Sequence, residues 1–433
     1  MELQLSVGTA KVDITPPFAL PLAGFASRNN RNFENIDSRL YLRTFYFQQH
    51  STDGSKLQSL LLSADILFWS EELADQLRMR IERQWGIKVD AIILHATHTH
   101  SGPAISMRTI GIGEPDPNYL VFLEQAVMQS VEQAVGDAEP VNIQMGKGIS
   151  EIGVNRRKKN GDQIVLSPNP EGVTDPELRV YVFTTLSGKK KGVLTHFACH
   201  PTLTDRNSVS SEFCGYAMER LENRYDSLTV CAYLQGCCGD INPVKPNVAE
   251  SNQDVISIVG QRFADDVDAI LSGELEWLEP NVLSSRRSIA VLPFAEIPTK
   301  DKLQRVVDES ASADVRKWAQ SFLEQPDKLR KQFRFEITKL EIAEGLTFIA
   351  MNGEMVVEYG LFLKSCSPVL VPLAYSNGMI GYITTANQLQ EGGYEPIESV
   401  TYFGLPCPFD QAVEAEVKKQ LMAIIDEPKN EEE

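Results

Sequence analysis

The chain has 433 residues, of which 42% are apolar and 23% are charged. These proportions are typical of a globular protein with a large core and exclude an intrinsically disordered chain. Lys and Arg number 41 against 59 Asp and Glu, and the formal net charge of −18 repels phosphate backbones and anionic membranes, so we expect no nucleic-acid partner.

The N-terminal segment MELQLSVGTAKVDITPP lacks the basic start and the continuous apolar run of a secretory signal. No apolar stretch approaches the roughly 20 residues that span a bilayer, so we expect no integral membrane segment. Seven cysteines without such a signal fit reduced thiols better than a disulfide framework. We therefore expect a cytoplasmic protein.

Helix-like and strand-like segments alternate along the first part of the chain. Residues 71–85 have helical spacing, with Ser70 as a candidate N-cap and Gly86 as a stop. The apolar run VDAIILHAT at 89–97 predicts a strand, and residues 119–135 predict a second helix. This alternation favours a mixed α/β (α+β) fold.

A predicted hairpin and a further strand follow. Residues 178–186 and 192–199 predict two strands joined by a tight turn. Residues 228–235 predict another strand, which runs into the segment GCCGDINP at 236–243. The Gly, Asp, Asn and Pro residues of that segment mark a sharp loop, and loops on rigid strand ends often carry function.

The composition changes near residue 280, where several prolines separate apolar segments. Residues 301–335 are charged and helix-prone, whereas residues 336–354 return to a strand pattern. We therefore expect a single large domain over residues 1–425, with a possible subdomain boundary near 280 and a helical excursion at 301–335. The acidic tail 426–433 is expected to be disordered.

Five of the six histidines lie in two short clusters. On a strand, His98 and His100 would point to the same face while His95 points to the other. His196 and His200 would be about 13 Å apart on a strand, too far to share one ion. His200, before a Pro-Thr turn, is the better ligand candidate, and we expect His95 and His196 to be packing residues.

A zinc site built on two histidines needs at least one oxygen or sulfur ligand and an open position for water. Cys199, Cys237 and Cys238 are the sulfur candidates, but free cysteines are among the most buried residues and we expect these three to be small apolar core residues. Glu354 is the oxygen candidate because it follows a predicted strand.

Several segments in a consistent order resemble the neutral/alkaline (non-lysosomal) ceramidase family in its N-terminal catalytic domain. They are GTAKVDITPP, LAGFASR (22–28), THTHSGP (97–103), GVNRR (153–157), FACHPT (197–202), EFCGYA (212–217), QGCCGDINP (235–243), NGE (352–354) and GYITT (381–385). The match spans residues 8–404, and THTHSGP and GDINP are its most specific parts.

The resemblance implies a zinc-dependent amidohydrolase that acts on a small-molecule or lipid-like N-acyl substrate such as ceramide. The implied Zn²⁺ ligands are His98, His200, Glu354 and Tyr382, with Tyr375 as the alternative tyrosine. His100 resembles the residue that faces the substrate, and Arg156 resembles the arginine that holds the scissile group. From the residues alone, Arg156 fits equally well as one charge of a solvated run, RRKK.

Longer family members continue into a C-terminal β-sandwich domain, which we do not expect here. The choice between ceramide and another N-acyl compound therefore stays open. Asp240 and Asn242 in the GDINP segment are candidates for orienting the ligand histidines, but we favour a role as turn residues.

Two other functions are consistent with the histidine and carboxylate residues. A metal-dependent esterase or phosphoesterase would have a two-metal site, with Asp13, Asp65 and Asp240 as candidate ligands. A non-catalytic metal-binding protein is the other. About one zinc per chain would favour the amidohydrolase, two metals the esterase, and none the non-catalytic protein.

Overall fold

The structure is a computed structural model that describes residues 4–51, 54–225, 228–246, 254–329 and 332–426. Its central feature is a mixed nine-stranded sheet with the order β12-β10-β9-β6-β1-β3-β4-β5, in which β14 pairs with β6. The strands are β1 (Ser6–Asp13), β3 (Tyr41–His50), β4 (Lys56–Ala64), β5 (Ile92–Ala96), β6 (Glu139–Ile149), β9 (Glu177–Thr185), β10 (Lys190–Phe197), β12 (Val230–Gln235) and β14 (Glu276–Leu278). The pairs β4–β5 and β10–β12 are parallel, and the other pairs are antiparallel.

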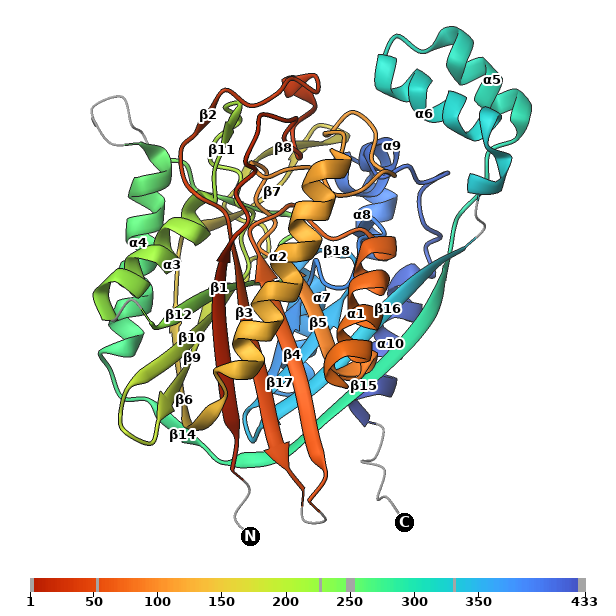
Figure 1. The fold of residues 1–433 in the computed structure, drawn as a ribbon. Coiled ribbons are helices and arrows are strands. Elements are labelled where there is room, and N and C mark those ends of the chain that lie inside the picture. The colour runs from red at the N-terminus through yellow and green to blue at the C-terminus, as the bar shows by residue number, and fades with distance from the viewer. Residues whose placement is uncertain (1–3, 52–53, 226–227, 247–253, 330–331, 427–433) are drawn as a thin grey trace.

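Helices cover one face of this sheet and a second sheet covers the other. The helices are α1 (Glu71–Trp85), α2 (Pro117–Gly136), α3 (Glu212–Tyr225) and α4 (Val255–Leu271). The second sheet has the order β15 (Pro280–Pro293), β16 (Gln332–Ala343), β17 (Leu346–Met351) and β19 (Leu370–Leu373). In Figure 1, α2 crosses in front of β1 and β3, and the second sheet lies behind them.

The alternation of side chains along β3 explains this layering. Phe45 and Phe47 belong to a core shared with Phe348 of the second sheet, whereas Tyr46 belongs to the core that contains Val127 of α2. Successive side chains of a strand point to opposite faces, so a strand that is apolar at all three positions must be covered on both sides. The mixed α/β class expected from the sequence is confirmed.

The ends of α1 agree with the sequence prediction. The Ser70 hydroxyl accepts a hydrogen bond from the backbone N–H of Leu73 at 3.2 Å, and Gly86 has the left-handed φ of 71° that favours glycine after a helix. Helix α2 begins two residues before its predicted start because Asp116 caps it, accepting from the N–H of Asn118 at 2.8 Å.

The helical excursion consists of α5 (Lys300–Glu309) and α6 (Ala313–Glu324), which project from the body as a hairpin (Figure 1). A small core of its own holds the hairpin together, around Leu303 and Phe322. The prediction of helix up to residue 335 is wrong at its end, because β16 begins at Gln332 and pairs with β15. Apart from Asp426 at the end of the last helix, the predicted tail lies outside the described residues.

Short elements lie above one end of the two sheets. They are β2 (Asn35–Ile36), β7 (Gly153–Asn160), β8 (Gln163–Asn169), β11 (Ser208–Val209), β13 (Ile241–Pro243), β18 (Glu354–Met355), β20 (Tyr382–Ile383), α8 (Ala386–Glu391), a π-helix η4 (Tyr394–Glu398) and α9 (Ser399–Tyr402). Helices α7 (Val357–Cys366) and α10 (Val413–Asp426) pack against the second sheet, and single 3-10 turns lie at Ala26–Arg28, Val89–Ala91 and Pro326–Lys328.

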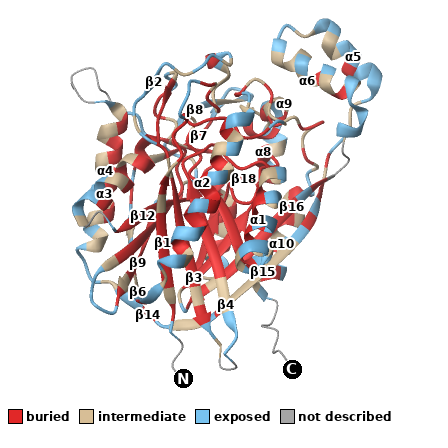
Figure 2. Cartoon of the chain, viewed as in Figure 1, coloured by how far each residue is buried: buried red, intermediate tan, exposed pale blue. Residues whose placement is uncertain are grey.

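The region above the sheets is itself largely buried. Figure 2 shows buried residues continuing from the strands into the segments around β7 and β18. Polar side chains in this buried region therefore lie inside the protein, and they include the residues singled out from the sequence. As a separate finding, no helix among the described residues is long and apolar enough to cross a membrane.

Candidate metal and catalytic site

Two histidines and a glutamate converge on one point. Glu354 Oε1 lies 3.1 Å from His98 Nε2 and 2.8 Å from His200 Nε2. Two ligands that each lie about 2.0–2.1 Å from one tetrahedral zinc ion are roughly 3.3 Å apart. The spacing of the three atoms is therefore close to that of ligands around a single ion.

The hydrogen bonds of the two rings show what faces this point. His98 Nδ1 lies 2.7 Å from the Leu67 carbonyl oxygen, and His200 Nδ1 lies 3.1 Å from that of Ile241. A carbonyl oxygen only accepts, so Nδ1 carries the hydrogen and, in a neutral ring, Nε2 presents its lone pair. Three acceptors thus face one another with no hydrogen between them, and a cation among them satisfies all three.

Burial and neighbouring charges favour the protonation states in which His200 and Glu354 can bind a metal, namely a neutral imidazole and an ionised carboxylate. Burial, with the Arg156 guanidinium next in importance, lowers the pKa of His200 to about 4. Burial alone would raise the pKa of the Glu354 carboxyl, whereas positive charge on the adjacent His98 and His200 rings brings that pKa well below its usual range, and a cation bound between neutral rings would act in the same direction. A neutral His200 and an ionised Glu354 suit a divalent metal.

His98 reaches this point by a route that the sequence did not predict. Strand β5 ends at Ala96, and His98 has a left-handed φ of 66°. The proximity of His98 and His100 is confirmed, since their Nε2 atoms are 3.2 Å apart, but strand alternation is not its cause. The two rings instead meet nearly at right angles, at an interplanar angle of 88°.

Glu354 lies beside Tyr382 because β18 and β20 pair in parallel with these two residues in register. The Tyr382 hydroxyl accepts a hydrogen bond from Arg156 at 2.8 Å, and Tyr375 donates to Glu354 Oε1 at 3.5 Å while lying 3.1 Å from the Cys238 sulfur. The Tyr375 ring also stacks on His98, with 4.0 Å between centroids. The structure therefore brings both tyrosines to the cluster.

Arg156 is buried, and its interpretation as part of a solvated run is wrong. The register between β7 and β8 shifts between Asn155 and Arg157, and a bulge of this kind re-aims side chains. As a result, two consecutive arginines reach one carboxylate. Arg156 Nε donates to Glu395 Oε1 at 2.9 Å and Arg157 Nη1 donates to Glu395 Oε2 at 2.6 Å.

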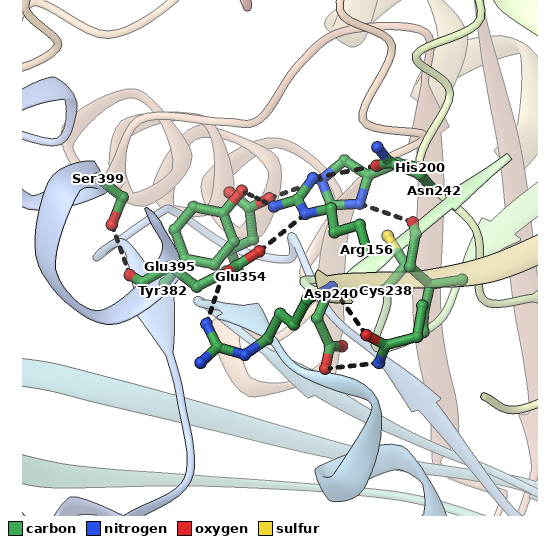
Figure 3. A network of polar contacts seen from close by, with 12 residues as sticks. Arg156, His200, Cys238, Asp240, Asn242, Glu354, Tyr382, Glu395 and Ser399 are labelled. Atoms are coloured by element: carbon green, nitrogen blue, oxygen red, sulfur yellow. Dashed lines mark hydrogen bonds and ion pairs between the residues drawn. The ribbon is translucent and has the colours of Figure 1, made fainter. Parts of the chain in front are cut away.

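The remaining contacts of Arg156 aim it at the histidine cluster (Figure 3). Its Nη1 donates to Asn242 Oδ1 at 3.1 Å and lies 3.5 Å from His200 Nε2. Its Nη2 donates to the Tyr382 hydroxyl. Each terminal nitrogen of a guanidinium carries two hydrogens, and Nη2 has a single partner among the described residues, so its second hydrogen is left for a ligand.

The GDINP segment supports the site mainly through residues other than its aspartate. Asp240 accepts from the Val357 N–H at 2.9 Å and from Gln388 at 3.1 Å, away from the histidines. The Ile241 carbonyl orients His200, and Asn242 orients Arg156. The preference for Asn242 as a turn residue is therefore wrong, whereas Asp240 does not contact the histidines.

The carboxylates of the two-metal hypothesis lie elsewhere. Asp13 pairs with Arg39, and Asp65 pairs with Arg43 at 3.1 Å. Within the described ranges, the one cluster of three such side chains with ligand atoms within 4.8 Å of one another is His98, His100 and His200, which shares two histidines with the His98, His200 and Glu354 group and contains none of these aspartates.

The predicted packing residues have structural contacts. His95 Nε2 accepts from the Gln235 N–H at 2.8 Å, and His196 Nε2 lies 2.8 Å from the Pro372 carbonyl oxygen. Cys199, Cys237 and Cys238 are buried, and burial raises the pKa of each thiol. These cysteines are therefore neutral thiols, as expected of core residues.

His100 is half-buried beneath the segment LAGFASR. A Cβ atom on Gly24, which has a φ of 102°, would lie 2.6 Å from His100 Nδ1, so only glycine fits there. The Phe25 ring lies 5.1 Å from the His100 ring. Burial, followed by the neighbouring His98, lowers the pKa of His100 well below its ordinary value, which keeps the ring neutral.

Sequence reasoning missed two residues that hold this arrangement. Arg28 donates to the Ala23 carbonyl at 2.8 Å, to the His100 carbonyl, and to the Ser101 hydroxyl at 3.0 Å. Glu395 lies in a π-helix, a conformation that often marks functional sites. The LAGFASR segment was a visible signal for Arg28, whereas a single glutamate in the sequence gives no signal for Glu395.

The mixed α/β fold thus holds a buried centre made of His98, His200 and Glu354. A neutral histidine, His100, and an arginine, Arg156, lie beside this centre. Residues 5–261 match the sequence model of the family described as neutral/alkaline non-lysosomal ceramidase, N-terminal. The chain belongs to this family, and the resemblance stated from its motifs is confirmed.

A curated relative is the neutral ceramidase of Pseudomonas aeruginosa, which is 25% identical over 261 residues. That alignment covers 56% of this chain but only 37% of the relative. The crystal structure of neutral ceramidase from Pseudomonas aeruginosa has a TM-score of 0.77, at 18% identity, over 97% of this chain and 74% of its own. A second structure, described as ceramidase complexed with C2, also has a TM-score of 0.77, at 17% sequence identity. That comparison covers 98% of this chain and 76% of the other chain. These two structures show that the fold is shared.

Proposed function

We propose that this protein is a zinc-dependent amidohydrolase that cleaves the N-acyl bond of a ceramide-like substrate. The observation that carries the proposal is the convergence of two imidazole lone pairs and one carboxylate oxygen on a single buried point. Membership of the ceramidase family supports the amide as the bond and a lipid-like N-acyl compound as the substrate.

The residues that would hold the ion are His98, His200, Glu354 and Tyr382. We assign the tyrosine position to Tyr382 because its hydroxyl oxygen already accepts from a cation, Arg156, and it is in register with Glu354. When bound at this position, zinc would lower the pKa of a water molecule to about 7 and polarise the scissile carbonyl.

The chain's own residues supply the remaining chemistry. Arg156 Nη2 has one hydrogen without a partner among the described residues and would donate it to the carbonyl oxygen as negative charge develops there. His100 lies beside the proposed ion, with its Nε2 3.2 Å from His98 Nε2, and as an imidazole outside the proposed ligand set it would accept a proton and pass it to the leaving amine.

Metal analysis combined with an amide panel tests the proposal. The zinc-loaded protein should hold about one zinc per chain and should hydrolyse N-acyl amides that include ceramides of differing chain length. His98→Ala and His200→Ala should lose zinc and activity together. His100→Ala should keep zinc and lose activity by roughly 10²–10⁴-fold, the usual worth of a general acid or base.

His50→Ala is the matched control, because His50 is an exposed histidine outside both clusters. It should keep zinc and activity. Loss of zinc from His100→Ala would overturn the division of roles, and two metals per chain would favour the esterase hypothesis. Hydrolysis of short amides without turnover of ceramide would sink the lipid substrate and keep the mechanism.

A further inference from the structure

Tyr375 connects the two chain segments that carry His98 and Glu354. It lies between β19 and β20, and its side chain is fully buried. Its backbone N–H donates to the Gly353 carbonyl at 3.2 Å, and its own carbonyl accepts from the Ala96 N–H at 3.2 Å. Gly353 directly precedes Glu354, and Ala96 lies two residues before His98. The backbone of one residue therefore bonds to both of these segments.

The backbone of Tyr375 has a conformation that residues other than glycine rarely adopt. Its φ is 54°, in the left-handed region, where the β-carbon lies close to the following carbonyl oxygen. Asn377 also has a positive φ, of 59°, and it exchanges two hydrogen bonds of 2.8 Å with the backbone of Leu94. Such conformations persist where surrounding contacts fix them, and they cluster at functional sites. The contacts of this segment thus hold Tyr375 in one place.

The side chain of Tyr375 contacts both proposed ligands as well. Its ring stacks on the His98 ring, with 4.0 Å between centroids and 25° between planes. Its hydroxyl donates to Glu354 Oε1 at 3.5 Å, and this oxygen is the one that faces His98 Nε2 and His200 Nε2. A carboxylate oxygen has two lone pairs. Glu354 Oε1 can therefore bind a metal ion with one lone pair and accept from Tyr375 with the other.

Cys238 determines the direction of this hydrogen bond. Its sulfur lies 3.1 Å from the Tyr375 hydroxyl oxygen. A phenol has one hydrogen and an ionised carboxylate only accepts, so the hydrogen of Tyr375 belongs to the bond with Glu354. The thiol of Cys238 therefore donates to the phenol oxygen. The result is a chain of two hydrogen bonds that runs from Cys238 through Tyr375 to Glu354.

We infer that Tyr375 is a positioning residue of the metal site, which holds Glu354 Oε1 and the His98 ring in place while Cys238 orients its hydroxyl. This inference rests on the proposed function and gives a role to the tyrosine that is not in the proposed ligand set. Partners that lie behind metal ligands fix the orientation of those ligands, and their loss typically costs roughly 10–100-fold in metal affinity.

Tyr375→Phe tests the inference, because phenylalanine keeps the ring that stacks on His98 and removes only the hydroxyl. The zinc affinity of this variant, measured by competition with a chromophoric chelator, should fall roughly 10–100-fold. The absorption spectrum of its cobalt-substituted form should shift, because the oxygen ligand is no longer held in the same orientation. A purely structural role would leave that spectrum unchanged.

Tyr119→Phe is the matched control for the loss of a buried hydroxyl. Tyr119 is fully buried in α2, and its hydroxyl donates to the Ile14 carbonyl at 2.7 Å rather than to a proposed ligand. The control should unfold at a lower urea concentration than wild type, because it leaves a buried carbonyl without its donor. Its zinc affinity and cobalt spectrum should nevertheless match those of wild type.

The two adjacent cysteines provide a second pair of variants. Cys238→Ala removes the donor to Tyr375 and should weaken zinc binding by up to about fivefold, the worth of one neutral hydrogen bond. Cys238→Ser keeps a donor and should restore the affinity. Cys237→Ala is the matched control, because Cys237 is also buried but the sulfur beside Tyr375 is that of Cys238. It should bind zinc as wild type does.

Three outcomes separate the possible roles. A zinc affinity and a cobalt spectrum of Tyr375→Phe that equal those of wild type would overturn the inference. In the copper(II)-substituted protein a phenolate ligand gives a charge-transfer band, and loss of that band in Tyr375→Phe but not in Tyr382→Phe would make Tyr375 a ligand instead. Wild-type protein that binds zinc but hydrolyses no amide would sink the proposed function alone, because the zinc affinities of the variants would still decide the role of Tyr375.

Discussion

Replacing Glu395 by glutamine tests how the site holds its arginine. The Glu395 carboxylate is fully buried and pairs with Arg156 at 2.9 Å and with Arg157 at 2.6 Å. In Glu395→Gln the two guanidinium groups, themselves 7% and 5% exposed, lose their shared anion, and the new amide places a donor against a donor. Breaking a buried ion pair from one side costs about 3–5 kcal/mol, which is the fall in unfolding free energy that we expect.

Glu391→Gln is the matched control. Glu391 is a carboxylate on the same Arg157, at 3.1 Å, but its side chain is 40% exposed. An exposed pair contributes about 0–1 kcal/mol, so the control should unfold close to wild type in urea. Both proteins should keep zinc, because the described contacts of neither glutamate include a metal-ligand candidate.

Activity gives the second measurement on this pair of variants. An arginine misplaced by about 1 Å costs roughly 10²-fold, and we expect Glu395→Gln to lose that factor mainly in kcat. Burial would raise the pKa of Glu395, but Arg156 and Arg157 lower it below its usual 4.5. Its stabilising effect is therefore complete above pH 4.5 and is lost as the pH falls below that value. The reasoning is refuted if Glu395→Gln matches Glu391→Gln in urea at neutral pH.

Three further predictions concern a buried carboxyl, the arginine that holds the His100 segment, and one helix end. Burial raises the pKa of Glu212 to about 7, so the charged form costs stability as the pH rises from 4.5 to 7. Glu212→Gln should therefore be more stable than wild type by up to about 3 kcal/mol at pH 8 and by little at pH 4.5, as urea titrations at both values will show. Arg28→Lys cannot reach all the acceptors of the guanidinium, so kcat should fall at least roughly tenfold with zinc content unchanged, because the His100 segment is released. Ser70→Ala removes the cap of Leu73 N–H and should cost about 1 kcal/mol of unfolding free energy without changing kcat.

Local sequence signals predicted the elements well where the cause of the structure is local. Helix α1 starts after Ser70 and stops before Gly86 because a hydroxyl acceptor and a left-handed glycine act within one turn. The hairpin of β9 and β10 follows from two apolar runs and a tight turn. The end of the excursion was misplaced because β16 is held by its pairing with β15, which lies well before it in the chain.

The convergence of the site depends on contacts between distant residues. His98 and Glu354 are 256 positions apart; the strand pattern made Glu354 an oxygen candidate for the histidine site, and the resemblance to a family gave it as a ligand beside His98. Neither carbonyl that fixes a histidine tautomer has a sequence signal, since every residue has a carbonyl. The run RRKK likewise contains no sign of the bulge that turns Arg156 inward.

Strand β13 links the candidate metal ligand His200 and Arg156 through two consecutive residues. The Ile241 carbonyl accepts from both the backbone N–H of His200 at 3.0 Å and its ring. Asn242 accepts from Arg156 at 3.1 Å. Because Ile241 and Asn242 are neighbours on one strand paired with β7, a shift of that strand moves both contacts together. Metal geometry and recognition of the scissile carbonyl would therefore change jointly.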